Sequence, residues 1–143
     1  MNINPTVTAT ELRAELASLG ARELVAALRD GLRDPVTQEG EVSVAKKIHR
    51  ADLKLDWTRA ATELDRVVRV GGAWTFAGST VLKVHETCPV EGTAIPGKLN
   101  GDLVGTGDGL LRLLIVQPEG KSRLKATAWI NGARLGPDTQ LGT

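Results

Sequence analysis

The chain has 143 residues, of which 41% are hydrophobic, so it is long and apolar enough to build one domain with a small appendage and is not a disordered tail. Its longest apolar run, 109–116, is too short to span a bilayer, and the single cysteine, Cys88, rules out an intrachain disulfide. The N-terminus has no basic segment followed by an apolar one, so we expect a cytoplasmic protein without a membrane partner.

The net charge of +1 is unevenly distributed along the chain. Residues 1–45 hold four arginines and seven acidic residues, a net charge of −3, whereas residues 46–143 hold fourteen basic and ten acidic residues, a net charge of +4. A mildly basic second part is compatible with a polyanionic partner, although a solvated charged face is the more common reason for such a surplus.

Residues 8–30 are predicted to form one amphipathic helix. Thr8 and Glu11 have the spacing of a capping box, and Gly31 is a suitable stop. The apolar face of this helix must be buried against something. It consists of leucines near helical spacing, namely Leu12, Leu16, Leu19, Leu24 and Leu28.

The next segments are predicted to be a linker and a second, shorter helix. Residues 33–41 have the composition of a linker, and residues 42–54 are expected to be extended or irregular. The stretch "LDWTRAATELDRVVRV" favours a helix with Thr58 as its N-cap. The inner face of that helix is expected to hold Ala61, Leu64, Val67 and Val68.

From residue 73 the pattern becomes typical of β-structure. The stretch "AWTFAGSTVLKV" predicts a hairpin with Ala77 and Gly78 at its turn, and further turn signals follow at Asn100-Gly101 and at 107–109. About five short strands within roughly 50 residues favour a small closed or sandwich-like unit, and the five-stranded OB-fold barrel is the first candidate. The tail "SRLKATAWING" fits a strand and a helix equally well.

No motif in the sequence assembles a nucleophile, a base and a stabilising group. The Gly-rich stretch 105–109 precedes a strand-like run, which favours a hairpin turn over a phosphate loop. His49 and His85 stand without a second ligand, and Cys88 is expected to be a small strand residue. We therefore predict no catalytic, cofactor-binding or metal-binding residues in this chain.

Clusters of basic residues are the features that stand out. Each cluster could simply make the surface soluble, and phosphate contact is favoured only if the clusters share one face. The residues predicted to contact RNA are Lys46, Lys47, His49, Arg50, Arg69, Lys83, Lys121, Arg123 and Lys125.

Several stretches, taken in order, resemble the C-terminal domain of the methionyl-tRNA formyltransferase family. They are "AKKIHRADLKLDWTRAATELDRVVRV", "GGAWTFAGSTVLKV", "PGKL", "TGDGLLRLLIVQPEGKSRL" and "WINGARL". The resemblance covers about Thr8 to Gly142, and its most specific pieces are "KLDW", "VQPEGK" and "NGARL". The form "GGAW" is similar to that of the actinobacterial branch.

The resemblance implies an α+β or mainly β domain, an OB-like barrel of five to six strands with flanking helices. Residues 42–143 would form this domain, and residues 1–41 would be the end of the family's catalytic domain and a linker. The family's C-terminal domain binds initiator tRNA rather than DNA, and Lys46, Lys47, His49 and Arg50 match its basic linker. The segment "PEGKSRL" would join the last long strand to a terminal helix that ends at Asn131-Gly132. Lys121 and Arg123 there either hold a phosphate or merely flank a corner.

The resemblance also implies a catalytic domain that these 143 residues do not include. That domain carries an Asn, a His and an Asp for formyl transfer and binds 10-formyltetrahydrofolate, so the chain alone is not expected to catalyse. One alternative is a subunit that completes a formyltransferase supplied by another polypeptide. Another is a docking or oligomerising piece that does not bind RNA and acts through helix 8–30, as a homodimer or on a partner. Trp57, Trp74 and Trp129 are expected to pack rather than to stack on bases.

Overall fold

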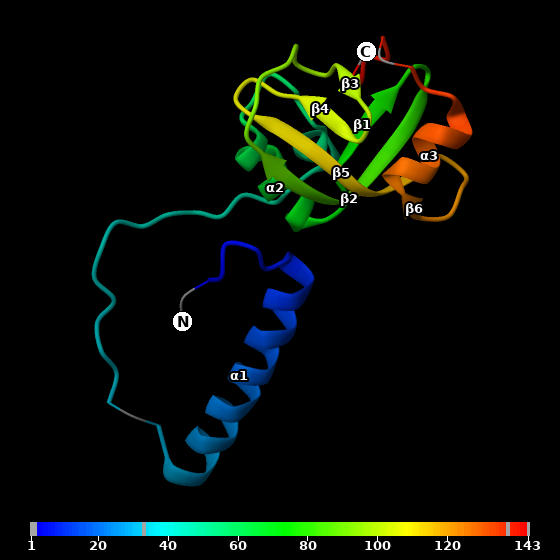
Figure 1. Cartoon of the computed structure of the whole chain (residues 1–143). Coiled ribbons are helices and arrows are strands. Elements are labelled where there is room, and N and C mark those ends of the chain that lie inside the picture. The colour runs from blue at the N-terminus through cyan, green and yellow to red at the C-terminus, as the bar shows by residue number, and fades with distance from the viewer. Residues whose placement is uncertain (1–2, 33, 137, 143) are drawn as a thin grey trace. The chain divides into compact units, whose positions relative to one another are not determined.

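The structure is a computed structural model that describes residues 3–32, 34–136 and 138–142. The chain divides into two compact units between Ile48 and His49 (Figure 1). Among the described residues, every buried one lies in the second unit, at Leu55 or beyond. The hydrophobic core therefore belongs to the second unit, which is also the basic part of the sequence.

The first unit contains the predicted long helix, α1 (Ala9–Asp30). Thr8 caps it as expected, because the Thr8 hydroxyl accepts from the Glu11 amide at 3.3 Å and the Glu11 carboxylate accepts from the Thr8 amide at 2.8 Å. The hydrogen bonds that the Thr8 amide and hydroxyl donate to the Glu11 carboxylate lower the pKa of that carboxyl. The helix ends at Gly31, which has φ 85°, and no residue of α1 is buried.

The second unit is built on a six-stranded antiparallel sheet. Its strands are β1 (Trp74–Ala77), β2 (Thr80–Val90), β3 (Leu99–Asn100), β4 (Leu103–Gly105), β5 (Leu110–Pro118) and β6 (Leu124–Lys125). They follow the order β1-β2-β5-β4-β3, and β6 pairs with the end of β5 that β4 leaves open. The short helix η1 (Arg50–Leu53) precedes the sheet. The predicted α+β class is confirmed.

The named strands curl without closing, so the unit is barrel-like only loosely. The described C-terminal segment lies between the two edge strands. The Leu99 amide donates to the Thr139 carbonyl at 3.0 Å, and on the other side the Gly142 amide donates to the Phe76 carbonyl at 2.8 Å. Single bridges at Ala77 and at Lys98 accompany these bonds. The sequence did not predict these contacts of the C-terminal segment, because the segment forms no regular strand.

Two hairpin turns lie one residue later than the sequence suggested. Ala77 pairs with Thr80, so the first turn is Gly78-Ser79, and the second follows Asn100, which still belongs to β3. Gly78 has φ 59°, the left-handed backbone that two-residue hairpin turns require. The Gly-rich stretch 105–109 joins β4 to β5, so the prediction of a hairpin turn is confirmed.

The second helix, α2 (Ala61–Val70), begins later than predicted, and Thr58 is not its N-cap. The Thr58 amide and hydroxyl instead donate to the Asp56 carboxylate at 3.1 and 2.7 Å, which lowers the pKa of Asp56. The helix has no side-chain cap, because the Asp108 carbonyl of the Gly-rich turn accepts from the Ala61 amide at 2.9 Å. The predicted inner face is confirmed, with three of its residues buried and Val67 packed at the edge of the core.

The ambiguous tail contains both a strand and a helix, β6 followed by α3 (Ala126–Ala133). The helix runs past Asn131-Gly132, the expected end, and is capped by Arg134 with φ 52°. Figure 1 shows α3 beside β6, to the right of the strands, and α2 to their left. The two helices and the inner face of the sheet enclose the core, whose members include Leu64, Val68, Leu82, Val84, Leu111, Leu113, Val116, Ala126 and Trp129.

Candidate nucleic-acid interface

Three antiparallel strands bring an aromatic, a basic and an amide side chain into one row. The register pairs Trp74 of β1 with Lys83 of β2, and Lys83 with Gln117 of β5. Paired residues of neighbouring strands project to the same face. The neighbours of Lys83, Leu82 and Val84, are buried, so the row lies on the outer face of the sheet.

The helix η1 and the residue after it place two cations over the aromatic end of this row. The Arg50 guanidinium carbon lies 5.2 Å from the centroid of the Trp74 ring, and the Lys54 ammonium lies 5.8 Å from the same centroid. The Lys54 ammonium is also 5.3 Å from the centroid of the Phe76 ring. Distances under about 6 Å are typical of cation–π attraction. We call Arg50, Lys54, Trp74 and Phe76 the basic-aromatic cluster.

Backbone contacts hold the basic-aromatic cluster in place. The Trp74 indole nitrogen donates to the Arg50 carbonyl at 2.9 Å, and the Leu55 amide donates to the Trp74 carbonyl at 2.8 Å. The rings of Trp74 and Phe76 meet edge to face at 5.4 Å. Arg50 and Lys54 are both exposed, whereas Trp74 is half-buried beneath them. The two charges are therefore available to a partner while their support stays fixed.

The turn "PEGK", residues 118–121, forms a wall beside the same row. The Lys121 amide donates to the Pro118 carbonyl at 3.1 Å, and Gly120 has φ 69°, as a turn of this kind requires at its third position. Gln117 closes the turn, because its amide nitrogen donates to the Lys121 carbonyl at 2.8 Å. The other end of that amide bonds the His85 ring at 3.0 Å.

The turn and the row enclose a pocket of about 220 Å³, which we call the Arg50–Lys83 pocket. Its lining residues are Arg50, Val81, Lys83, Gln117, Pro118, Glu119 and Gly120. Two of the nine residues predicted to bind RNA thus meet at one pocket, although they are 33 positions apart in the sequence. Lys121 is exposed next to it, at the end of the turn.

The remaining predicted RNA-binding residues do not line this pocket. Lys46 and Lys47 are exposed in the irregular segment of the first unit. His49 precedes Arg50, and its backbone amide donates to the Asp52 carboxylate at 2.8 Å. Two other cations, Arg123 and Lys125, are exposed before and within β6.

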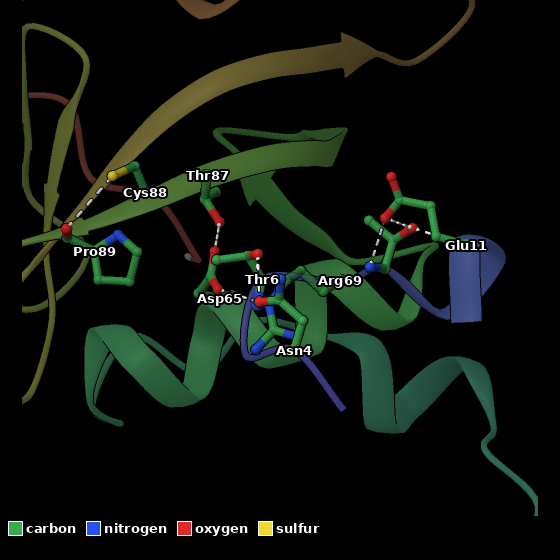
Figure 2. A network of polar contacts seen from close by, with 9 residues as sticks. Asn4, Thr6, Glu11, Asp65, Arg69, Thr87, Cys88 and Pro89 are labelled. Atoms are coloured by element: carbon green, nitrogen blue, oxygen red, sulfur yellow. Dashed lines mark hydrogen bonds and ion pairs between the residues drawn. The ribbon is translucent and has the colours of Figure 1, made fainter. Parts of the chain in front are cut away.

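Arg69 of α2 lies in a different setting. Its guanidinium donates to the Asp65 carboxylate at 2.9 Å, and the Thr87 hydroxyl of β2 donates to the same carboxylate at 2.8 Å (Figure 2). The side chains of Arg69 and Asp65 are only 23% and 16% exposed. The ion pair lies within α2, and the Thr87 hydrogen bond to Asp65 joins the helix to the sheet.

Sequence reasoning missed Lys54 and the role of both aromatic residues of the cluster. Trp57 and Trp129 pack in the core as predicted, but Trp74 supports two cations at the surface. The available signal was the alternation of β1, in which Trp74 and Phe76 flank the buried Thr75 and so point to the outer face.

Metal sites, membrane-spanning helices and the cysteine are the other features that bear on function in the described part of the chain. No three His, Cys, Asp or Glu side chains come together there in a way that could hold a metal ion. None of the described helices has the length and apolar character needed to cross a membrane. Cys88 is an exposed strand residue of β2, as predicted.

Comparison with known proteins relates the chain to one family. A family model described as "Formyl transferase, C-terminal domain" matches residues 47–134. Methionyl-tRNA formyltransferase of Gluconacetobacter diazotrophicus is 35% identical over 99% of this chain and 49% of its own length. The enzymes of Streptomyces coelicolor and Leifsonia xyli are 37% and 41% identical, over 98% and 92% of this chain and 50% and 47% of theirs.

A solved structure has a similar fold. HypX from Aquifex aeolicus, as a multiply substituted variant, has a TM-score of 0.59 and 18% identity, and the match covers 82% of this chain and 23% of that one. The chain spans about half the length of the curated relatives it matches. Because the family model covers more than half of the chain and the relatives match nearly all of it, the chain belongs to the formyl transferase family, in which it corresponds to the C-terminal domain.

Proposed function

We propose that this domain is the tRNA-binding module of a methionyl-tRNA formyltransferase, with initiator tRNA as its partner in the cytoplasm. The observation that carries the proposal is the basic-aromatic cluster, in which Arg50 and Lys54 lie over Trp74 on the outer face of the sheet. The curated relatives named above are methionyl-tRNA formyltransferases, and this supports tRNA as the partner.

Binding to the phosphate backbone would dominate the affinity. Exposed cations that neutralise phosphates release counterions, so affinity falls as salt rises. The cations that share this face or flank it are Arg50, Lys54, Lys83 and Lys121. Four such contacts would weaken binding roughly 100-fold between about 50 and 200 mM salt.

We assign the formyl-transfer step to the part of the relatives that this chain does not match. The resemblance attributes both the catalytic residues and the 10-formyltetrahydrofolate site to that part. The role left to this domain is to hold the tRNA body while the acceptor end is processed elsewhere. The chemistry of its RNA contacts is the same whether the domain is linked to the catalytic part in one polypeptide or supplied as a subunit.

The proposal is tested by a salt titration of binding between the full chain and labelled initiator tRNA. An elongator tRNA and a DNA duplex serve as competitors. We expect micromolar or tighter binding at low salt, a steep salt dependence, and stronger competition by either tRNA than by DNA. Absence of binding at low salt, or equal competition by DNA, would contradict the proposal.

A second candidate function is association through α1. None of the residues of this helix is buried, and Leu24, Val25 and Leu28 are 61%, 54% and 79% exposed. An apolar stripe of this kind favours contact with another protein surface. The partner surface would belong either to a second copy of the chain or to the catalytic part of a formyltransferase.

A further inference from the structure

We propose that the Arg50–Lys83 pocket seats a single phosphate group of the RNA backbone. This inference rests on the proposed function, since it names the point at which the tRNA would be anchored. The pocket is formed by β2, by the end of β5 with the turn after it, and by the first residue of η1, three segments that are distant in the sequence.

The size of the pocket favours a phosphate with part of its sugar. Its volume is about 220 Å³. Pockets that enclose a whole drug-sized ligand are larger, at about 300–1,000 Å³. A phosphodiester linkage is small enough to enter while its bases remain outside. The pocket therefore suits a backbone contact that carries no sequence information, which is the usual role of phosphate contacts.

The donors that face the pocket favour an anion. The Gln117 amide is engaged at both ends, by His85 and by the Lys121 carbonyl, so it has little left to offer a ligand. Arg50 and Lys83 then remain as the charged donors of the lining, and Glu119 is its one acid. Two cations against one carboxylate leave a net charge of +1, and Glu119 is exposed, so it can turn toward solvent.

Trp74 acts on this pocket as a positioning residue for Arg50. Its indole N–H binds the Arg50 carbonyl, and its ring lies under the Arg50 guanidinium. A guanidinium held on an aromatic face loses less conformational freedom when it binds a phosphate, and it can offer two parallel N–H groups. Because Arg50 and Lys54 occupy the region over the ring, Trp74 supports the cations and does not stack on a base there.

Variants of the full chain test the site by two measurements. Arg50→Gln and Lys83→Gln each remove one charge from the pocket, and Arg66→Gln, at an exposed position of α2, is the matched control. We expect each pocket variant to weaken tRNA binding roughly tenfold and to lower the slope of log affinity against log salt by about 1. The control should weaken tRNA binding by about twofold or less. Losses no greater than that of the control would overturn the proposal.

Inorganic phosphate provides the second measurement. Titrating it into the ¹⁵N-labelled chain should move the amide resonances of Lys83 and Gly120 along a saturable curve. The shifts should disappear in Lys83→Gln and persist in Arg66→Gln. Shifts that are linear, or that are equal in the two variants, would overturn the assignment of the pocket.

The role of Trp74 is separated from a general effect on folding by a conservative pair. Arg50→Lys keeps the positive charge but loses the paired N–H groups of the guanidinium. Its affinity for tRNA should therefore lie between those of the wild type and Arg50→Gln. Trp74→Phe keeps an aromatic face and should bind tRNA better than Trp74→Leu at matched thermal stability. Equal affinity of these two Trp74 variants would overturn the positioning role.

The two proposals fail in different ways. If the chain binds no tRNA but phosphate saturates the pocket, the anion site stands, whereas its RNA source and the proposed function fall. If the affinity of the chain for tRNA falls steeply as salt rises but the pocket variants behave like Arg66→Gln, the proposed function stands and the assignment of the pocket falls.

Discussion

Trp74 donates its indole N–H to the backbone carbonyl of Arg50 at 2.9 Å, while the guanidinium of Arg50 lies 5.2 Å from the centroid of the same ring. One side chain thus fixes both the backbone and the charged end of another, 24 positions earlier in the sequence. The arrangement explains why a large aromatic residue is only half-buried at the edge of the sheet. Its ring packs against two cations, Arg50 and Lys54, and meets the Phe76 ring edge to face at the surface.

Two glycines are expected to respond in opposite ways to alanine. A Cβ at Gly107 would lie 1.8 Å from the Thr58 carbonyl oxygen, so the backbone would have to move, whereas a Cβ at Gly132 would meet nothing within 4 Å. Gly107→Ala should destabilise the domain by more than about 2 kcal/mol, since neither backbone can yield without loss of the turn that caps α2. Gly132→Ala, inside α3, should stabilise by about 0.5–1 kcal/mol.

Urea unfolding followed by tryptophan fluorescence measures both variants. A Gly107→Ala midpoint close to that of the wild type would contradict the close approach of the Gly-rich turn to Thr58.

Arg69 should affect stability more than RNA affinity. Its guanidinium is held by Asp65, which also accepts from Thr87, so this group is engaged within the fold. Removal of Asp65 in Asp65→Ala should destabilise the domain by about 1–3 kcal/mol, the range for a partly buried polar partner that is lost. Arg69→Gln should weaken tRNA binding less than Lys83→Gln does.

Thermal unfolding and tRNA titration of the same samples separate the two effects. A tenfold loss of affinity in Arg69→Gln at unchanged stability would restore Arg69 as an RNA contact.

Helix α1 should make the chain associate at high concentration. Leu24 and Leu28 are one turn apart and exposed, and covering them releases water from apolar surface. The double variant Leu24→Gln with Leu28→Gln should lower the weight-average mass found by light scattering toward that of a monomer. The control, Arg22→Gln with Ala26→Gln, alters the opposite side of the helix and should leave association unchanged. A wild-type chain that stays monomeric throughout would rule out the homodimer.

The capping box of α1 should make its helicity depend on pH. Hydrogen bonds from Thr8 lower the pKa of Glu11 in the folded helix, so the stabilisation is fully present above the unfolded pKa. It is lost as the pH falls through the lower, folded pKa. Circular dichroism at 222 nm from neutral to acidic pH should show this loss, and Thr8→Ala should remove the step and weaken the helix by about 1 kcal/mol. An identical acid profile in Thr8→Ala would contradict the role of the box.

Local signals were sufficient wherever the partners are close in the sequence. The capping box at Thr8 and Glu11 spans one helical turn. Gly78 of the first hairpin supplies the positive φ that its own two-residue turn requires. The inner face of α2 follows from helical spacing, because a helix presents every third or fourth residue to the same side. These features, the α+β class and the family resemblance could all be predicted from the residues alone.

Features that depend on distant partners were decided only by the tertiary structure. Helix α2 begins at Ala61 because the Asp108 carbonyl, far along the chain, accepts its first amide, a partner that no local capping signal reveals. The tail divides into strand and helix because only Leu124 and Lys125 pair with β5, opposite Val116 and Ile115. The residues after this pairing form α3. The register of β1, β2 and β5 brings Trp74, Lys83 and Gln117 into one row, since hydrogen bonding between strands sets which side chains become neighbours. Basic residues could be identified in the sequence, but their meeting at one pocket is a property of the folded sheet.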